Sequence, residues 1–200
     1  MSVTVFVEGG GDGENTLRQC RQGFAAYCGK LAPTGRRPKI VACGGRNQAF
    51  DKFKTAIRLS EEGDICALLV DAEAPITAAN AVQHLAERDG WEFPEDLNGH
   101  QIFLMAQAME AWFMADREVL GEFYDGGFLA NSLPGRATDV ESIRKNDLEP
   151  RLRHATASTR TKGEYHKVKH GFDLLAAIDP MKVENGSPNA KEFNDFLRSL

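Results

Sequence analysis

The sequence has few of the features that mark secreted, membrane or zinc-binding proteins. Its 200 residues include four cysteines, with no CxxC pair and no histidines at zinc-finger spacing. The first ten residues carry no basic segment, and no stretch approaches the ~20 apolar residues of a membrane span. These absences predict a soluble, cytoplasmic protein that does not associate with membranes and whose thiols are free and mostly buried.

Charge is unevenly distributed along the chain. The formal net charge of −5 by itself argues against a polyanionic partner. However, residues 144–170 contain eight Lys or Arg against three acids, a net charge of +5, which leaves −10 for the rest of the chain. Such asymmetry fits an acidic site beside a basic surface that meets phosphates. An ordinary solvated helix face explains the basic segment equally well.

Apolar runs and amphipathic segments alternate over the first 120 residues. The apolar runs predict strands over 3–7, 38–43, 65–70 and 101–105, and the amphipathic segments predict helices over 15–31, 47–60, 77–88 and 109–115. Alternation of this kind implies right-handed crossovers between parallel strands. We therefore expect an α/β fold, with a mostly parallel sheet of about four strands and helices on both faces.

The pattern changes after residue 120. Gly and polar residues dominate 121–139, which predicts a loop, and helices are expected over 140–145, 148–156, 165–178 and 190–200. We therefore expect residues 1–120 to form the α/β core. Residues 121–200 would form a mainly helical extension packed on the same domain.

Acidic residues follow two of the predicted strands. Glu8 ends the first strand, and Asp71 and Glu73 end the third, in the stretch LLVDAEAP. Ligands of open parallel sheets bind beyond the carboxyl ends of the strands, so these three side chains would converge if the two strands are neighbours. Unpaired carboxylates so close together repel, and a hard divalent cation, Mg²⁺ or Mn²⁺, would relieve that repulsion. The alternative is that each acid caps the helix that follows it.

Glycines follow Glu8 but do not form a nucleotide-binding motif. In VFVEGGGDGENT the third glycine of GxGxxG is replaced by Glu14, and no GK[ST] follows. A glutamate at this strand end would also repel a phosphate unless a metal ion lay between them. We therefore interpret Glu8 as a group that binds a metal ion or moves a proton. The glycines would let another backbone segment come close.

Together these motifs resemble a known pattern. An acid followed by glycine after the first strand, with an acidic pair after the third, resembles the TOPRIM fold of topoisomerases, primases, recombination factors and OLD-family nucleases. More narrowly, VFVEGGGD, LLVDAE, MEAWFMAD and KGEYHKVKHGFDLLAAID are together similar to the bacterial family called domain of unknown function 4276. Members of that family are TOPRIM-like and often accompany ABC-type ATPases in loci associated with phage defence. The resemblance covers nearly the whole chain.

The resemblance implies roles for the acids. Glu8 would be a metal ligand or general acid/base, and Asp71 and Glu73 would be metal ligands, so that all three are candidate catalytic residues. The family pair is usually DxD, whereas the second acid here is Glu73, and its extra methylene changes the geometry available to two metal ions. Glu110, in MEAWFMAD, is a further candidate ligand, or equally an acid that begins a helix.

Three basic residues are candidate phosphate contacts. Lys162 and Lys167 lie in the late basic segment TRTKGEYHKVKHG, which carries one tyrosine. Arg46 begins a predicted helix directly after a Gly-Gly turn, where an anion would be favoured.

The leading hypothesis is a TOPRIM-like nuclease, or nuclease subunit, that depends on Mg²⁺ or Mn²⁺. It would act on DNA or RNA with an ABC-type ATPase partner, and a homodimer is also considered. A second hypothesis is a non-catalytic subunit that regulates or assembles an ATPase and has a structural acidic site. A receiver-like role for Asp71 is disfavoured, because Glu8 stands alone where receivers have two acids.

Overall fold

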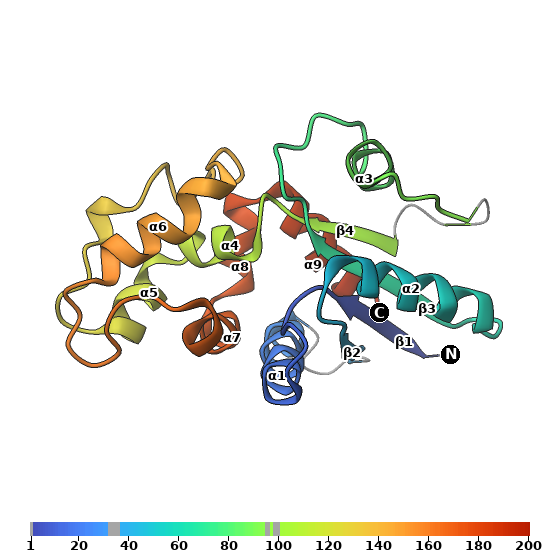
Figure 1. Ribbon diagram of the computed structural model, residues 1–200, viewed down its shortest axis with the longest axis horizontal. Helices are drawn as coiled ribbons and strands as arrows, with labels where there is room; N and C mark the ends of the chain where they lie inside the picture. The colour runs from blue at the N-terminus through green and yellow to red at the C-terminus, as the bar shows by residue number, and fades with distance from the viewer. Residues whose placement is uncertain (1, 32–36, 95–96, 98–100) are drawn as a thin grey trace.

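The computed structural model describes residues 2–31, 37–94, 97 and 101–200 (Figure 1). Its strands are β1 (Val3–Val7), β2 (Lys39–Ala42), β3 (Ile65–Asp71) and β4 (Ile102–Met105). The helices are α1 (Glu14–Leu31), α2 (Arg46–Leu59), α3 (Ala81–Asp89), α4 (Met109–Ala115), α5 (Arg117–Tyr124), α6 (Lys145–Thr156), α7 (Lys167–Ala177), α8 (Pro180–Gly186) and α9 (Pro188–Arg198). A short 3-10 helix covers Ala130–Ser132.

The four strands form one parallel sheet in the order β2-β1-β3-β4. Val7 of β1 is in register with Ala42 of β2 and with Leu69 of β3, and Asp71 of β3 is in register with Met105 of β4. The strands alternate in sequence with helices, so the fold is α/β and Rossmann-like, as predicted. β1 and β3 are neighbours, which is the condition on which the convergence of the acids depends.

Helices cover both faces of the sheet. Successive strand residues point to opposite faces, so Val5 and Val7 belong to one hydrophobic core and Phe6 to another. The first core is closed by α1, α4, α7 and α9, and the second by α2 and α3. β3, a continuous apolar run, is buried on both faces.

The C-terminal helices share the larger core with the sheet. α7 packs along α1, and α9 packs against β4. Trp112 of α4 stacks on Tyr27 of α1, with ring centroids 5.1 Å apart, and Phe193 of α9 is also stacked with Trp112, at 6.4 Å. The carboxyl ends of the strands point toward the group formed by α4, α5, α6 and α7 (Figure 1). This group therefore bounds the region in which the candidate acids lie.

One predicted helix does not exist. Residues 140–144 form turns rather than a helix, and the backbone N–H of Val140 donates to the carbonyl of Gly186 at 3.0 Å. A single helix, α6, then replaces the predicted 148–156 segment and starts three residues earlier, with Pro150 inside it. The prediction over 140–145 was wrong because a tertiary hydrogen bond stabilises the turn.

Two helices were missed although their caps are visible in the sequence. The Asp116 carboxylate accepts from the backbone N–H of Val119 and starts α5, which extends into the predicted loop. Asp179 accepts from the N–H of Met181 and starts α8, with Pro180 in the first turn. An acidic cap followed by proline is a common helix start. The other predicted helices are present, with their ends shifted by a few residues.

The structure bears on the cysteines and on the apolar segments of the chain. All four cysteines are free and buried, as predicted, and burial raises the pKa of the Cys20 and Cys28 thiols to about 12. Among the described residues, no helix is both long enough and apolar enough to cross a bilayer.

Candidate functional site

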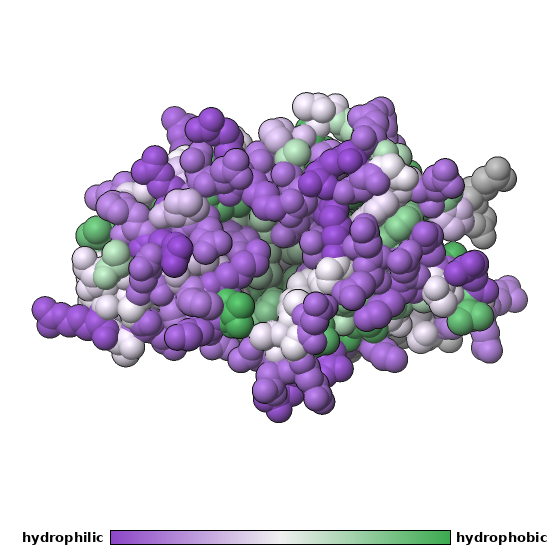
Figure 2. Space-filling view, viewed as in Figure 1, coloured by the Kyte–Doolittle hydropathy of each residue, from purple (hydrophilic) through white to green (hydrophobic). Residues whose placement is uncertain are grey.

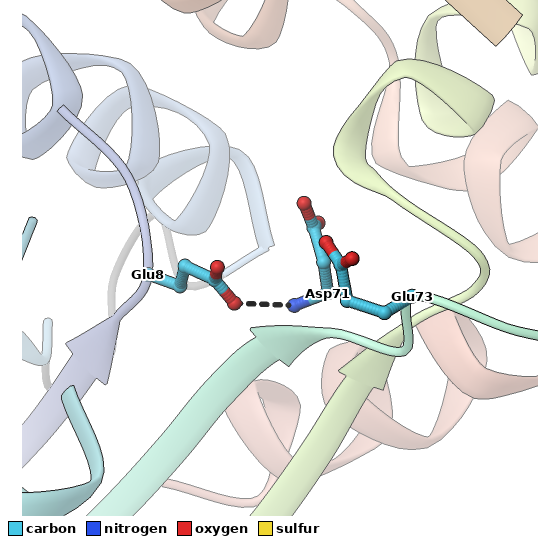
Figure 3. Close-up of side chains that lie close together, drawn as sticks. All are labelled: Glu8, Asp71 and Glu73. Carbon is cyan, nitrogen blue, oxygen red and sulfur yellow. Dashed lines mark hydrogen bonds between the residues drawn. The ribbon is translucent and has the colours of Figure 1, made fainter. Parts of the chain in front are cut away.

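Three of the predicted site residues come together at the carboxyl ends of β1 and β3. Glu8 directly follows β1, Asp71 is the last residue of β3, and Glu73 lies two residues further on. One carboxylate oxygen from each residue lies within 4.8 Å of the others. Figure 3 shows Glu8 reaching across toward β3, where the side chains of Asp71 and Glu73 stand side by side. The predicted convergence of these acids is therefore observed.

Glu8 is tied to β3 and to α2. Its Oε2 accepts from the backbone N–H of Asp71 at 3.2 Å, the dashed line in Figure 3, and from the Arg46 guanidinium, also at 3.2 Å. Burial raises the pKa of the Glu8 carboxyl above its ordinary value, while the charge of Arg46 opposes that shift. Glu8 is therefore a carboxylate positioned by its neighbours, with 18% of its side chain exposed.

Asp71 is the most buried of the three acids. Its Oδ1 accepts from the backbone N–H of Met109 at 2.8 Å, at the start of α4. Burial, together with the negative charges of Glu8 and Glu110, raises the pKa of Asp71 to about 8. Near neutral pH, in the absence of a cation, this carboxyl therefore holds its proton in most molecules.

Glu73 leaves the sheet in a left-handed backbone conformation, with φ of 66°. Its backbone N–H donates to the carbonyl of Gln107 at 2.7 Å, which ties the segment after β3 to the segment after β4. Its carboxylate forms ion pairs with Lys145 of α6 and, at 3.5 Å, with Arg88 of α3. The turn and these cations direct Glu73 toward Asp71.

Arg46, a predicted phosphate contact, is directed into the protein. Its Nε and one terminal nitrogen donate to the two oxygens of Asp89 at 3.0 and 2.7 Å, and the guanidinium lies over the Trp91 ring at 5.1 Å. The other terminal nitrogen donates to Glu8 and to the Asp71 carbonyl. Because all three nitrogens already have protein acceptors, Arg46 holds Glu8 in place, and a phosphate would have to displace those acceptors.

Glu110 lies beside this group but is paired elsewhere. Among the described residues, the three acids close enough to share a metal ion are Glu8, Asp71 and Glu73, and Glu110 is outside that group. Its Oε1 forms an ion pair with Lys167 Nζ at 2.9 Å and accepts from the Tyr165 hydroxyl at 3.3 Å. Glu110 is nearly fully buried, whereas half of the Lys167 side chain is exposed.

Lys162, the third predicted phosphate contact, does not join the acids. Its ammonium lies over the ring of Phe123, 4.2 Å from the centroid, on the surface of α5. Of the two candidate lysines in the late basic segment, the structure therefore brings Lys167 to the acidic site.

The glycines after β1 allow two backbone segments to meet, as predicted. Gly9 and Gly44 exchange hydrogen bonds in an isolated antiparallel bridge, with N···O distances of 2.9 and 3.1 Å. Gly44 has φ of 80°, and a Cβ there would lie 2.7 Å from the carbonyl oxygen of Gly11. Gly9 and Gly10 also have positive φ values. Any residue other than glycine would therefore be strained at this contact, because its Cβ would clash or its backbone would have an unfavourable φ.

A pocket of about 350 Å³ opens beside the acids. It is lined by Glu8, Asp71, the glycine loop over 9–12, Thr16, Gly44, Met105, Met109 and three residues of α7: Lys167, Val168 and Phe172. The pocket therefore joins the carboxyl end of the sheet to the helical extension.

Comparison with known proteins places the chain in a family. The model of the family described as Domain of unknown function (DUF4276) matches residues 7–200. The chain belongs to this family. No curated protein and no solved structure matches the chain.

In this DUF4276 chain, the acid group offers only carboxylate oxygens, the donors that Mg²⁺ and Mn²⁺ prefer. The three carboxylates are not the unpaired charges whose repulsion would call for a cation. Arg46 pairs with Glu8, and Lys145 pairs with Glu73. The high pKa of Asp71 keeps it mostly neutral. The donor set fits a hard divalent cation, and the ion pairs with Arg46 and Lys145 already offset part of its negative charge.

The groups that hold the acids of this DUF4276 chain could not be predicted from its sequence. Asp89 and Trp91 position Arg46 from the end of α3, and Lys145 reaches Glu73 from the start of α6. No spacing or motif pairs these residues, since they lie more than 40 positions from their partners. Tyr165 lies within the quoted motif KGEYHKVKHG, but its contact with Glu110 has no local signal.

Proposed function

We propose that this protein is a TOPRIM-like nuclease, or nuclease subunit, that depends on Mg²⁺ or Mn²⁺ and cleaves phosphodiesters of DNA or RNA. The observation that supports the proposal most is the placement of Glu8, Asp71 and Glu73. Oxygens of these three carboxylates lie within 4.8 Å of one another at the carboxyl ends of two adjacent parallel strands.

The three acids would hold the cation, each through a carboxylate oxygen. A bound cation of this kind activates water and offsets negative charge on the leaving oxygen. Asp71 has one oxygen fixed by the Met109 N–H, so it presents the other to the site once its proton has left. Glu8 is fixed by Arg46 and has a raised pKa, which suits a ligand or a general acid/base.

Lys167 is the candidate phosphate contact that the geometry supports best. It lines the pocket beside Asp71, and half of its side chain is exposed. Its pairing with the buried Glu110 raises its pKa against the effect of burial, so the ammonium stays charged. A charged amine in this position can contact a substrate phosphate without any movement of α7.

Nucleic acid is the partner that the surface charge supports. Basic residues of the late segment are exposed, namely Arg144, Arg151, Arg153, Arg160, Lys162 and Lys169. Cations on one segment favour binding to the phosphate backbone. The family resemblance is the ground for the further proposal of an ABC-type ATPase partner and a role in phage defence.

A Mn²⁺ titration by calorimetry tests the metal site. The wild type should bind Mn²⁺, and Glu8→Gln and Asp71→Asn should lose most of that binding while circular dichroism shows an intact fold. Glu62→Gln, at an exposed glutamate just before β3 and at the opposite end of that strand from Asp71, is the control and should bind as the wild type does. Cleavage of labelled single-stranded and duplex DNA and RNA, with and without the ATPase, then tests the activity.

One observation favours a second function, that of a non-catalytic subunit that regulates or assembles an ATPase. Glu8 and Glu73 already have cationic partners, so the acids are satisfied as structural groups. If no nucleic acid is cleaved with Mn²⁺ and the ATPase present, and folded Glu8→Gln and Asp71→Asn variants keep cellular function, this second function replaces the first. Loss of cellular function in folded variants excludes it.

A further inference from the structure

The pocket beside the acids has an apolar wall that faces solvent. Val168 and Phe172 lie one turn apart on α7 and both line it. Val168 is 50% exposed and is one of the few large hydrophobic side chains that are exposed among the described residues. Figure 2 shows a hollow in the middle of this face, with hydrophobic side chains at its edge. An exposed apolar side chain at a pocket rim indicates a surface that a ligand covers.

The inner part of the pocket suits a small, mostly apolar group. Met105 and Met109 line it and are almost fully buried. Methionine adapts its shape and makes favourable contacts with aromatic rings. The pocket volume of about 350 Å³ lies at the lower end of the range for small-ligand sites. A pocket of this volume, lined by two methionines, can accommodate a single aromatic ring system.

The charges around the pocket fit a group that carries a phosphate. Lys167 lies at the pocket and donates to Glu110 through one of its three N–H groups, which leaves donors for another acceptor. Asp12 of the glycine loop lines the same pocket, and its carboxylate can accept hydrogen bonds from a polar ring edge. Apolar walls, a polar edge and a cation together match a nucleobase with its adjoining phosphate.

We propose that this pocket receives one unstacked base of a single-stranded nucleic acid, with the neighbouring phosphate at Lys167 and the acid group. This inference rests on the proposed function and names its substrate class. A base inside a duplex is paired and stacked, and moving it into a pocket costs unpairing and unstacking energy. Single strands avoid that cost, so the pocket selects single-stranded substrate.

Fluorescence anisotropy with two labelled DNA strands of about 12 nucleotides tests the pocket. One strand is oligothymidylate, and the other has the same backbone with abasic sites throughout. Ca²⁺, which also takes oxygen ligands, replaces Mn²⁺ in this experiment. The wild type should bind the base-bearing strand about tenfold more tightly, the effect expected when one base is packed against a protein surface.

The variants are Val168→Asn and Leu129→Asn. Both sites are half-exposed hydrophobic residues, with 50% and 47% exposure, and only Val168 lines the pocket. Val168→Asn should lose most of the preference for the base-bearing strand, whereas Leu129→Asn should keep it. Comparing the ratio of the two affinities cancels any effect that a variant has on phosphate binding.

Three results would overturn the inference: equal binding of the two strands by the wild type, binding of neither, or an unchanged ratio in folded Val168→Asn. The wild-type ratio does not depend on any variant folding correctly. Cleavage is measured separately, so the two proposals can fail independently. A strand preference without cleavage would refute the nuclease alone, and cleavage without a strand preference would refute the base pocket alone.

Discussion

The guanidinium of Arg46 lies 3.2 Å from the carboxylate of Glu8 and donates through two other nitrogens to Asp89. One side chain at the start of α2 thus connects the end of β1 with the end of α3. Only 13% of it is exposed, so these ion pairs are weakly screened by solvent. Arg46 therefore helps to set the position of Glu8.

Replacing Arg46 with methionine should destabilise the protein by about 3 kcal/mol, because Glu8 and Asp89 would stay partly buried without their cation. Urea unfolding measures the change. Arg58→Met, at an exposed arginine of the same helix, is the control and should change stability by less than about 0.5 kcal/mol. Equal unfolding midpoints for the two variants would show that the Arg46 ion pairs contribute nothing.

Mn²⁺ affinity should rise with pH until about pH 8. Asp71 has a pKa of about 8 without metal, so below that pH the cation must displace its proton. With one proton released, the apparent affinity should increase roughly tenfold per pH unit between about pH 6 and pH 8, and level off above. Calorimetry at several pH values measures it. An affinity that does not change over this range would mean that Asp71 is not a ligand.

Asp71 should also make stability depend on pH in the absence of metal. The folded chain keeps the Asp71 proton up to about pH 8, whereas the unfolded chain releases it near pH ~3.9. Between these values the folded state binds more protons, so the free energy of unfolding contributed by this group falls as pH rises.

Asp71→Asn should lack that fall, since its side chain cannot ionise but can still accept from the Met109 N–H. The stability of the wild type minus that of Asp71→Asn should therefore decrease by a few kcal/mol from about pH 4 to pH 8. Urea unfolding in a chelator measures the difference. Asp51→Asn, at an exposed site, is the control, and a difference that is flat with pH for Asp71→Asn would contradict the prediction.

Gly44→Ala should lower the free energy of unfolding by about 1–3 kcal/mol. Its Cβ would lie 2.7 Å from the Gly11 carbonyl oxygen, in a backbone with φ of 80°. Gly126→Ala is the matched control, because a Cβ there meets no atom within 4 Å and φ lies outside the left-handed range. Thermal unfolding compares the two. If the two variants have the same midpoint of thermal unfolding, the Gly9–Gly44 contact does not constrain the loop.

Local patterns in the sequence were sufficient for the sheet and for its acids. An uninterrupted apolar run such as β3 is typical of a strand buried on both faces, and the carboxyl ends of parallel strands meet at one edge of the sheet. Glu8 and Asp71 could therefore be placed at the same edge of the sheet from their positions alone, and the adjacency of β1 and β3 brings them together. Helix boundaries after residue 120 were harder to predict, because the turn at Val140 depends on a hydrogen bond to Gly186, which lies far along the chain.

The α/β fold, the acids at one edge of the sheet and the close approach of backbone at the glycines all follow from patterns that are local in the sequence. The partners of those acids instead depend on packing between segments that lie far apart in the chain. Arg46 could have faced an anion, yet it turns inward to Glu8, and Lys167 pairs with Glu110 across 57 positions of sequence. The reason is physical: a long cationic side chain reaches many directions, and it settles where folding has buried a carboxylate that water no longer solvates.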